Sequence, residues 1–327
     1  MIKKERKRPI ILKKLEALDR RVPIHHTKKQ IVTRELAKVE AGFRGEQALN
    51  YHLTFLPKKN YFILHDLRLR DKEKGFFQID TVILTPKFHL VLEVKNIAGT
   101  LFFDQEFHQL IRTLPNESHT FPDPLLQIRR QKQQFQSWLA QNKFSDVPVI
   151  SYVIISSPSS TIQTIPRHSH LLRNVIHSAT LPLKVEELEK RYEHILYTTQ
   201  EMNALSRKLI KMHIPYNPDI LSLFQVCRED IIKGVYCENC LSYLIERVWG
   251  SWRCLNCKLI SNKAHISALE DYFLLFGPNI TNAELRSFLK IESESIAREI
   301  LTAICDESLG VIRIGVISCL LVLSKYG

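Results

Sequence analysis

The sequence predicts an α/β protein in which helices flank a mixed sheet, with a small cysteine-bearing module and a helical segment after it. Three observations lead to this class. Residues 37–220 alternate between helical and extended hydrophobic patterns, residues 234–260 hold two Cys-x-x-Cys pairs, and residues 263–327 combine three short helical patterns with a β-prone end. The chain of 327 residues is long enough for two or three domains, each with its own core.

The α/β part is predicted to begin with a helix. Hydrophobic residues recur at helical spacing from Thr27 to Pro57, in one helix or in a pair broken near Gly42 and Gly45. Extended patterns separated by turn residues follow, and an Asp-Pro pair at 123–124 marks the start of the next helix. The predicted strands are 61–69, 77–85, 89–96, 100–104 and 147–157, the predicted helices are 123–142 and 184–213, and a loop is predicted between 104 and 123.

Three charged residues interrupt two of these apolar strands. Glu93 and Lys95 are two apart and share a face, and antiparallel pairing through a turn at Pro86 brings Asp80 beside them. Buried charge is costly, so these groups must pair with each other, reach solvent or hold an ion. Two carboxylates suit Mg²⁺ or Mn²⁺, and Lys95 can then orient a water molecule or stabilise a phosphate. A salt-bridged strand pair without catalysis is the alternative.

Three motifs follow one another along the chain: GFRGEQALNYHL, FFQIDTVILTPKFHLVLEVKNIAGTLFFD and FPDPLLQIRRQKQQFQSWL. In this order they resemble the nuclease-related domain (NERD) of the PD-(D/E)xK restriction-endonuclease-like superfamily. The resemblance covers residues 37–145 and implies a restriction-endonuclease-like core that cleaves DNA with a metal ion. Before Asp80 the chain has Ile79 where the superfamily has proline, although Gln-Ile-Asp is the usual form within this family.

The resemblance also assigns roles to individual residues. It implies that Asp80 and Glu93 bind Mg²⁺ and that Lys95 completes the (D/E)xK motif. Glu46 matches the acidic residue that related nucleases carry on a helix, and Gln127 matches a polar residue that supports the site or contacts DNA.

Four of the seven cysteines have the spacing of a metal site. Cys237 and Cys240 are separated by thirteen residues from the pair Cys254 and Cys257, and four thiolates arranged in this way suit structural Zn²⁺. Residues 234–260 are therefore predicted to form a zinc ribbon, with redox activity of one pair as the rival. The ribbon either joins domains or binds nucleic acid through basic and aromatic residues: Arg247, Trp249, Trp252, Arg253 and Lys258.

Residues 263–327 are predicted to form a helix-turn-helix-like module. Thr281 and Glu284 form a capping box before a short helix, and a second helix follows a turn. Glu294, Ser295 and Arg298 would then face the major groove, whereas a small helical packing module is the alternative.

Residues 1–36 are predicted to form a basic N-terminal arm. Residues 1–45 hold 14 lysines and arginines against 5 acidic residues, which is +9 of the net charge of +12. Such a concentration of positive charge attracts polyanions, so DNA is the expected partner and RNA the second. A solvated leader without a partner is the alternative.

No secretory signal or membrane span is predicted, so the expected compartment is the cytoplasm. The apolar run at 311–324 is shorter than the roughly 20 residues of a membrane helix. It contains Arg313 and is predicted as terminal strands.

Three classes of function agree with these observations. The first is a DNA-processing nuclease that hydrolyses phosphodiester bonds with Mg²⁺. The second is a non-catalytic nucleic-acid-binding protein that keeps the nuclease fold, and the third is a zinc-containing scaffold for protein interactions.

Overall fold

The computed structural model describes residues 1–57, 61–71, 75–144, 146–306, 312–313 and 316–318. The chain divides into two compact units. The first unit contains residues 1–7 and 39–216, and the second contains residues 8–38 and 217–327.

A six-stranded mixed sheet forms the centre of the first unit. Its order is β1-β2-β3-β4-β8-β10. The pairs β2–β3 and β3–β4 are antiparallel, while β1–β2, β4–β8 and β8–β10 are parallel. The predicted mixed sheet flanked by helices is therefore confirmed. The strands are β1 (Ile2–Lys4), β2 (Phe62–Asp71), β3 (Gly75–Leu84), β4 (His89–Lys95), β8 (Val149–Ile155) and β10 (Val175–His177).

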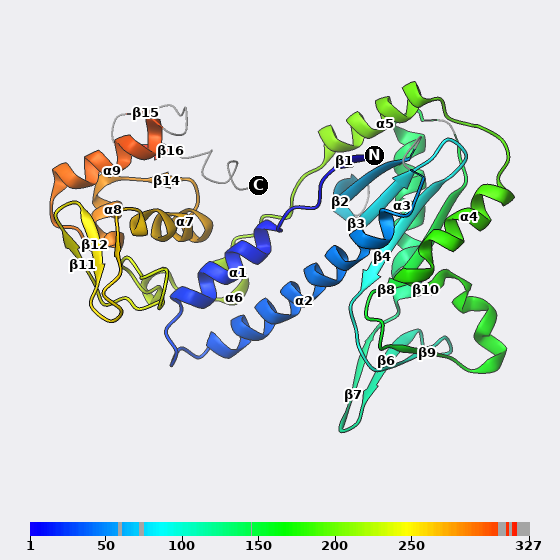
Figure 1. Cartoon of the computed structure of the whole chain (residues 1–327), viewed down its shortest axis with the longest axis horizontal. Helices are drawn as coiled ribbons and strands as arrows, with labels where there is room; N and C mark the ends of the chain where they lie inside the picture. Colours follow the sequence, from blue (N-terminus) through cyan, green and yellow to red (C-terminus); the bar gives the residue numbers. More distant parts are fainter. Residues whose placement is uncertain (58–60, 72–74, 145, 307–311, 314–315, 319–327) are drawn as a thin grey trace. The chain divides into compact units, whose positions relative to one another are not determined.

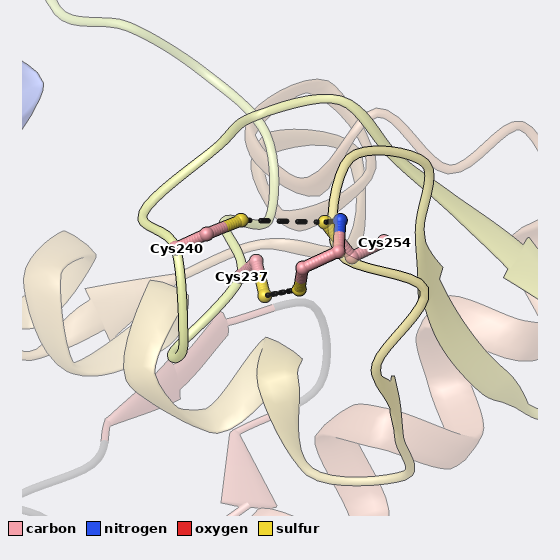
Figure 2. A group of neighbouring side chains, drawn as sticks. Cys237, Cys240 and Cys254 are labelled. Atoms are coloured by element: carbon pink, nitrogen blue, oxygen red, sulfur yellow. Dashed lines mark hydrogen bonds between the residues drawn. The ribbon is translucent and has the colours of Figure 1, made fainter.

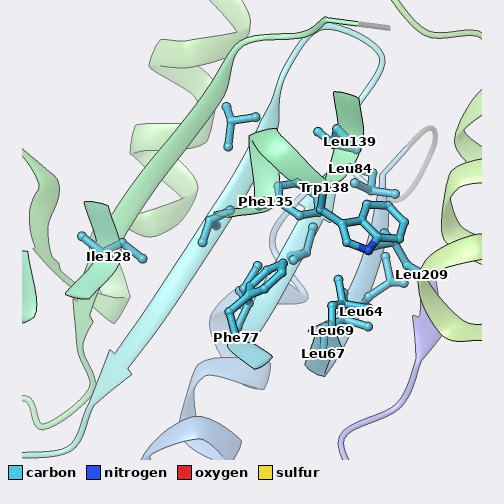
Figure 3. Packing of buried hydrophobic residues seen from close by; sticks show 14 of the residues in the cluster. Leu64, Leu67, Leu69, Phe77, Leu84, Ile128, Phe135, Trp138, Leu139 and Leu209 are labelled. Carbon is cyan, nitrogen blue, oxygen red and sulfur yellow. The ribbon is translucent and has the colours of Figure 1, made fainter. Parts of the chain in front are cut away.

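Helices cover both faces of this sheet (Figure 1). On one face, α3 (Pro124–Gln141) and α5 (Thr199–Met212) pack against the strands. On the other face, residues near the end of α2 (Lys29–Leu53) share a core with α4 (Leu181–Arg191). Figure 3 shows the first core, in which the large rings of α3 lie among leucines of β2 and β3. Burial of apolar surface on both faces stabilises the sheet that carries the charged residues.

A second sheet of four strands, in the order β7-β6-β5-β9, extends the first unit. Its strands are β5 (Thr100–Asp104), β6 (Gln109–Leu114), β7 (Glu117–Pro122) and β9 (Thr161–Gln163). The loop predicted between 104 and 123 is wrong, because β6 and β7 form a regular antiparallel hairpin there. Most side chains of β7 are exposed, so backbone pairing rather than hydrophobic alternation holds it.

The helix predicted over 184–213 is also wrong as one element, because α4 and α5 are separate helices. Between them, the backbone N–H groups of Leu196 and Tyr197 donate to the carbonyl of Pro86. Thr198 then starts α5 with a capping box that includes Glu201. A local start signal therefore overrides the continuous helical pattern.

The residues predicted as a basic arm form regular structure. They contain β1, the helix α1 (Ile10–Arg21) and the beginning of α2. In α1 the leucines Leu12, Leu15 and Leu18 are fully buried. The guanidinium groups of Arg6 and Arg21 are also buried. Part of the positive charge counted in the sequence is thus internal to the two units.

In the second unit, α1 packs with α6 (Ile220–Phe224) and α7 (Ala264–Phe276). Arg21 connects these parts, because its Nε donates to Asp271 Oδ2 at 2.7 Å and its Nη1 donates to the carbonyl oxygens of Ile232 and Gly234. The cysteine-bearing module folds as an antiparallel sheet of β11 (Ile245–Val248), β12 (Ser251–Cys254) and β13 (Ile260–Ser261).

Two helices near the C-terminus follow the predicted capping box. They are α8 (Asn282–Leu289) and α9 (Glu294–Asp306), and Thr281 Oγ1 caps α8 by accepting from the N–H of Glu284. A small sheet joins β14 (Asn279–Ile280), β16 (Val316–Ser318) and β15 (Ile312–Arg313). The rest of the apolar run predicted as terminal strands lies outside the described residues. Short 3-10 helices are Pro166–Asn174, Ser178–Thr180 and Arg228–Asp230.

Candidate active site and metal centre

Two neighbouring strands change their side-chain alternation at the same level of the main sheet. In β3, Ile79 and Val82 enter the same core although two residues separate them. Beside them in β2, Asp66 has a left-handed backbone with φ of 51°. This irregularity places Asp80 next to the end of β4, where its Oδ2 accepts from the N–H of Val94 at 2.8 Å. The regular pairing of β2 and β3 is thus interrupted at Asp66 and Asp80, the two residues that carry carboxylates.

Glu93 lies at the centre of a hydrogen-bonded network between β4 and α3. Lys95 Nζ donates to Glu93 Oε1 at 2.6 Å and to Gln127 Oε1 at 2.9 Å. Gln127 Nε2 donates to Glu93 Oε1 at 2.6 Å, and Gln131 Nε2 donates to Glu93 Oε2 at 2.7 Å. Glu93 is only 4% exposed, so these partners replace the water that the carboxylate loses on burial.

Glu46 reaches the same region from α2. The preceding Gly45 allows the helix to approach the sheet closely, because a Cβ atom there would lie 2.2 Å from Asn96 Cβ and 2.8 Å from Ser156 Oγ. Glu46 forms an ion pair with Arg6, whose side chain is 2% exposed. Close packing of α2 on the sheet therefore brings a third carboxylate, that of Glu46, near Asp80 and Glu93.

Burial and neighbouring carboxylates raise the pKa of Asp80 and that of Glu46. Burial, and then the charges of Glu93 and Glu46, raise the pKa of Asp80 well above its usual value, against the opposing effects of the Val94 N–H and Lys95. Burial likewise raises the pKa of Glu46 to about 8, although Arg6 acts in the opposite direction. The charged forms of these carboxyl groups are thus disfavoured as long as no further cation lies beside them.

Asp80 and Glu93 line a polar pocket of about 550 Å³. Arg130 of α3 and Phe76 of β3 also line it, and the guanidinium of Arg68 lies 3.8 Å from the centre of the Phe76 ring. The pocket therefore joins carboxylates to a cationic and aromatic border. Its lining residues are Phe76, Phe77, Gln78, Asp80, Glu93, Gln127, Arg130, Gln131 and Gln134.

The donors in this pocket fit a hard divalent cation. Asp80 and Glu93 offer carboxylate oxygens, and their mutual repulsion is the interaction that a cation relieves. They do not form a closed cage: in the part of the chain that the structure describes, only the four cysteines bring three or more His, Cys, Asp or Glu ligand atoms within 4.8 Å of one another. A cation held by the two carboxylates would keep water among its ligands, as Mg²⁺ commonly does.

The four predicted cysteines converge in the second unit (Figure 2). The Sγ atoms of Cys237 and Cys257 are 3.5 Å apart, and so are those of Cys240 and Cys254. A tetrahedron of sulfurs around Zn²⁺ has edges of about 3.8 Å, so the cluster could bind a metal such as zinc. Hydrogen bonds, first from the Leu259 N–H, lower the pKa of Cys257 to about 6 and favour its thiolate form.

The residues predicted for nucleic-acid contact in the cysteine-bearing module have different surroundings. Trp249 is fully exposed at the tip of the β11–β12 hairpin. Trp252 is 3% exposed and its Nε1 donates to His265 Nδ1, so this ring cannot stack on a base. Arg253 Nε donates to Glu246 Oε1 at 2.7 Å. Trp249 is therefore the freer of the two tryptophans for a ligand.

Three residues of the first site were not predicted. Asp66 interrupts the apolar strand FILHDLRL, which is the same signal that identified Asp80. Gln131 follows Gln127 by one helical turn, so the spacing could have indicated it. Arg6 has no comparable signal, because it precedes Glu46 by 40 residues in a segment that resembles a basic arm.

Comparisons with known proteins find similarity to a nuclease-related domain within the first unit. Residues 41–156 match the family model described as nuclease-related domain. An uncharacterized protein of Bacillus anthracis is 22% identical over 183 residues, which cover 54% of this chain and 82% of that protein. No solved structure gives a significant match. Among the described residues, no helix is both long and apolar enough to cross a membrane.

Proposed function

We propose that this protein hydrolyses phosphodiester bonds in DNA with Mg²⁺ or Mn²⁺, as a member of the PD-(D/E)xK superfamily. One observation carries the proposal: Asp80, Glu93 and Gln127 line one polar pocket, and Lys95 donates hydrogen bonds to Glu93 and Gln127. All four lie within residues 41–156, which match the nuclease-related domain.

The proposed chemistry divides among the residues of the pocket. A bound divalent ion would supply Lewis acidity and lower the pKa of a coordinated water. Asp80 and Glu93 would hold that ion. Lys95, fixed by Glu93 and Gln127, can donate a hydrogen bond to a phosphate oxygen as negative charge grows on it. Arg130, in the lining of the same pocket, can pair with a neighbouring phosphate.

For the second unit we propose a structural role. Zn²⁺ held by the four cysteines would stabilise residues 234–260 as a zinc ribbon, since a closed four-thiolate site has no open position for a substrate. Residues 263–327 would add a helix-turn-helix-like module. Residues 37–220 would form the nuclease domain.

One observation favours a non-catalytic nucleic-acid-binding protein as the second candidate. Both oxygens of Glu93 already accept hydrogen bonds, from Lys95 and from two glutamines. A satisfied network of this kind can be retained for structure alone. A metal ion would have to displace one of these donors or share an oxygen with it.

Cleavage of single- and double-stranded DNA with Mg²⁺ or Mn²⁺ distinguishes these candidates. We expect metal-dependent products from the wild type, none from Asp80→Asn, and wild-type products from Asp146→Asn, which changes an exposed carboxylate. Equal DNA binding without cleavage in all three proteins would reject the nuclease and support the second candidate. Absence of salt-sensitive DNA binding would favour a protein-interaction scaffold.

A further inference from the structure

Arg6 occupies a buried position behind the carboxylates of the first unit. Its Nη1 donates to Asp66 Oδ1 at 2.8 Å and pairs with Glu46. Its Nη2 lies 3.0 Å from His65 Nδ1 and donates to Thr81 Oγ1 at 2.9 Å. Because an arginine stays protonated in proteins, this is a permanent positive charge held between two carboxylates.

The charges of this region form two groups. Asp80 and Glu93 line the pocket, with Lys95 beside them. Glu46 and Asp66 are not among the lining residues of the pocket, and both pair with Arg6. The next cation is Lys4, whose Nζ donates to the backbone carbonyls of His65 and Asp66 rather than to a carboxylate. Among the described residues, Arg6 is therefore the cation that forms ion pairs with both carboxylates of the second group.

Nucleases that use two metal ions place the ions about 3.5–4 Å apart, so a second ion needs carboxylate oxygens that are free to bind it close to the first. Here the carboxylates that could serve a second ion already hold a guanidinium. We infer that Arg6 takes the place of a second cation, so that the pocket binds a single divalent ion at Asp80 and Glu93. This inference rests on the proposed function, because it concerns the metal content of the same site.

Arg6 also contacts the strand that carries the first metal ligand. Its Nη2 donates to the carbonyl oxygen of Asp80 at 3.5 Å and, more strongly, to the hydroxyl of Thr81. Arg6 is thus a positioning residue, because it acts through Glu46, Asp66 and the backbone of β3. The matched domain, residues 41–156, would lack this cation if expressed alone.

Titration calorimetry with Mn²⁺ on the zinc-loaded full chain tests the inference without measuring cleavage. We expect about one high-affinity ion per wild-type chain and none in Asp80→Asn. In Arg6→Met the freed pair Glu46 and Asp66 should take up an additional ion, giving about two per chain. Arg6→Lys should restore about one, and so should Arg6→Met combined with Asp66→Asn.

The outcomes separate the inference from the proposed function. Two ions in the wild type, or one ion in a folded Arg6→Met, would overturn the inference and leave the nuclease proposal intact. Absence of Mn²⁺ binding to the wild type would reject the metal-dependent function and the inference with it. Circular dichroism and zinc content report folding, and Arg6→Gln replaces Arg6→Met if the methionine variant does not fold.

Discussion

The first unit and the second unit each hold a candidate cation site, and the two sites are built in opposite ways. The first is the polar pocket lined by Asp80 and Glu93, called the acidic pocket below, and the second is the cluster of four cysteines. The pocket takes its ligands from strands of a sheet that has a core on each face, so the fold exists without the ion. The cluster sits on a short three-stranded sheet, with ligands from two close pairs along the chain. A cation should therefore contribute chemistry at the first site and folding free energy at the second.

Loss of a cysteine ligand is the change for which we expect the largest effect on stability. Cys254→Ser, or zinc removal by a chelator, should cost the second unit several kcal/mol and lower its Tm by more than about 10 °C. The first unit should keep its own transition. Calorimetry of the full chain measures both, and Cys227→Ser is the control, because that thiol is exposed and outside the cluster. If Cys254→Ser lowered the Tm of both units by the same amount, the proposed difference between the two cation sites would be wrong.

At the acidic pocket, removal of a ligand should have the opposite effect on stability. In Asp80→Asn the repulsion from Glu93 and Glu46 disappears. We therefore expect the free energy of unfolding of the metal-free first unit to increase by about 1 kcal/mol, and its Tm to rise. The proposed cleavage should fall on the order of 10³-fold. A fall in Tm without metal, relative to Asp146→Asn, would mean that Asp80 is a structural residue.

The two sites also differ in how far the sequence predicts them. Spacing alone predicts the cluster of four cysteines, because the two cysteines of each Cys-x-x-Cys pair are held close together by the short chain between them. Alternation and family motifs identified Asp80, Glu93 and Lys95. The motifs do not indicate the left-handed backbone at Asp66, which shifts the alternation of buried side chains in β2. They also do not indicate the contact of Arg6 with Glu46, which lies 40 residues away in the sequence. Those features depend on tertiary packing, as does the exposed β6–β7 hairpin, whose side chains carry no hydrophobic period.

The acidic pocket also depends on how closely α2 approaches the sheet, and two glycines of that helix separate the effects. Gly45→Ala should destabilise the first unit by about 1–3 kcal/mol, because the new methyl group would overlap Asn96 and Ser156. Gly42→Ala, with open space around its Cβ, should instead stabilise the helix by up to about 1 kcal/mol. Chemical denaturation measures the change in free energy of unfolding for both variants. A stabilisation by Gly45→Ala as well as by Gly42→Ala would show that α2 can move away from the sheet.

The smallest effect we predict is a pH dependence of opposite sign at the two sites. Because the pKa of Glu46 is raised to about 8 in the fold, the folded first unit binds more protons than the unfolded chain. That contribution is fully present below the usual glutamate pKa of about 4.3 and is lost as pH rises through about 8.

The cysteine cluster should respond in the other direction, because zinc binds thiolates and protons compete with it as pH falls. Melting curves of zinc-loaded protein between pH 5 and pH 8 should therefore show the first unit losing stability with rising pH while the second gains it. Addition of Mg²⁺ should weaken the first trend, since a bound cation favours ionised carboxylates. The same trend with and without Mg²⁺ would indicate that the charges of the pocket are balanced by the protein alone.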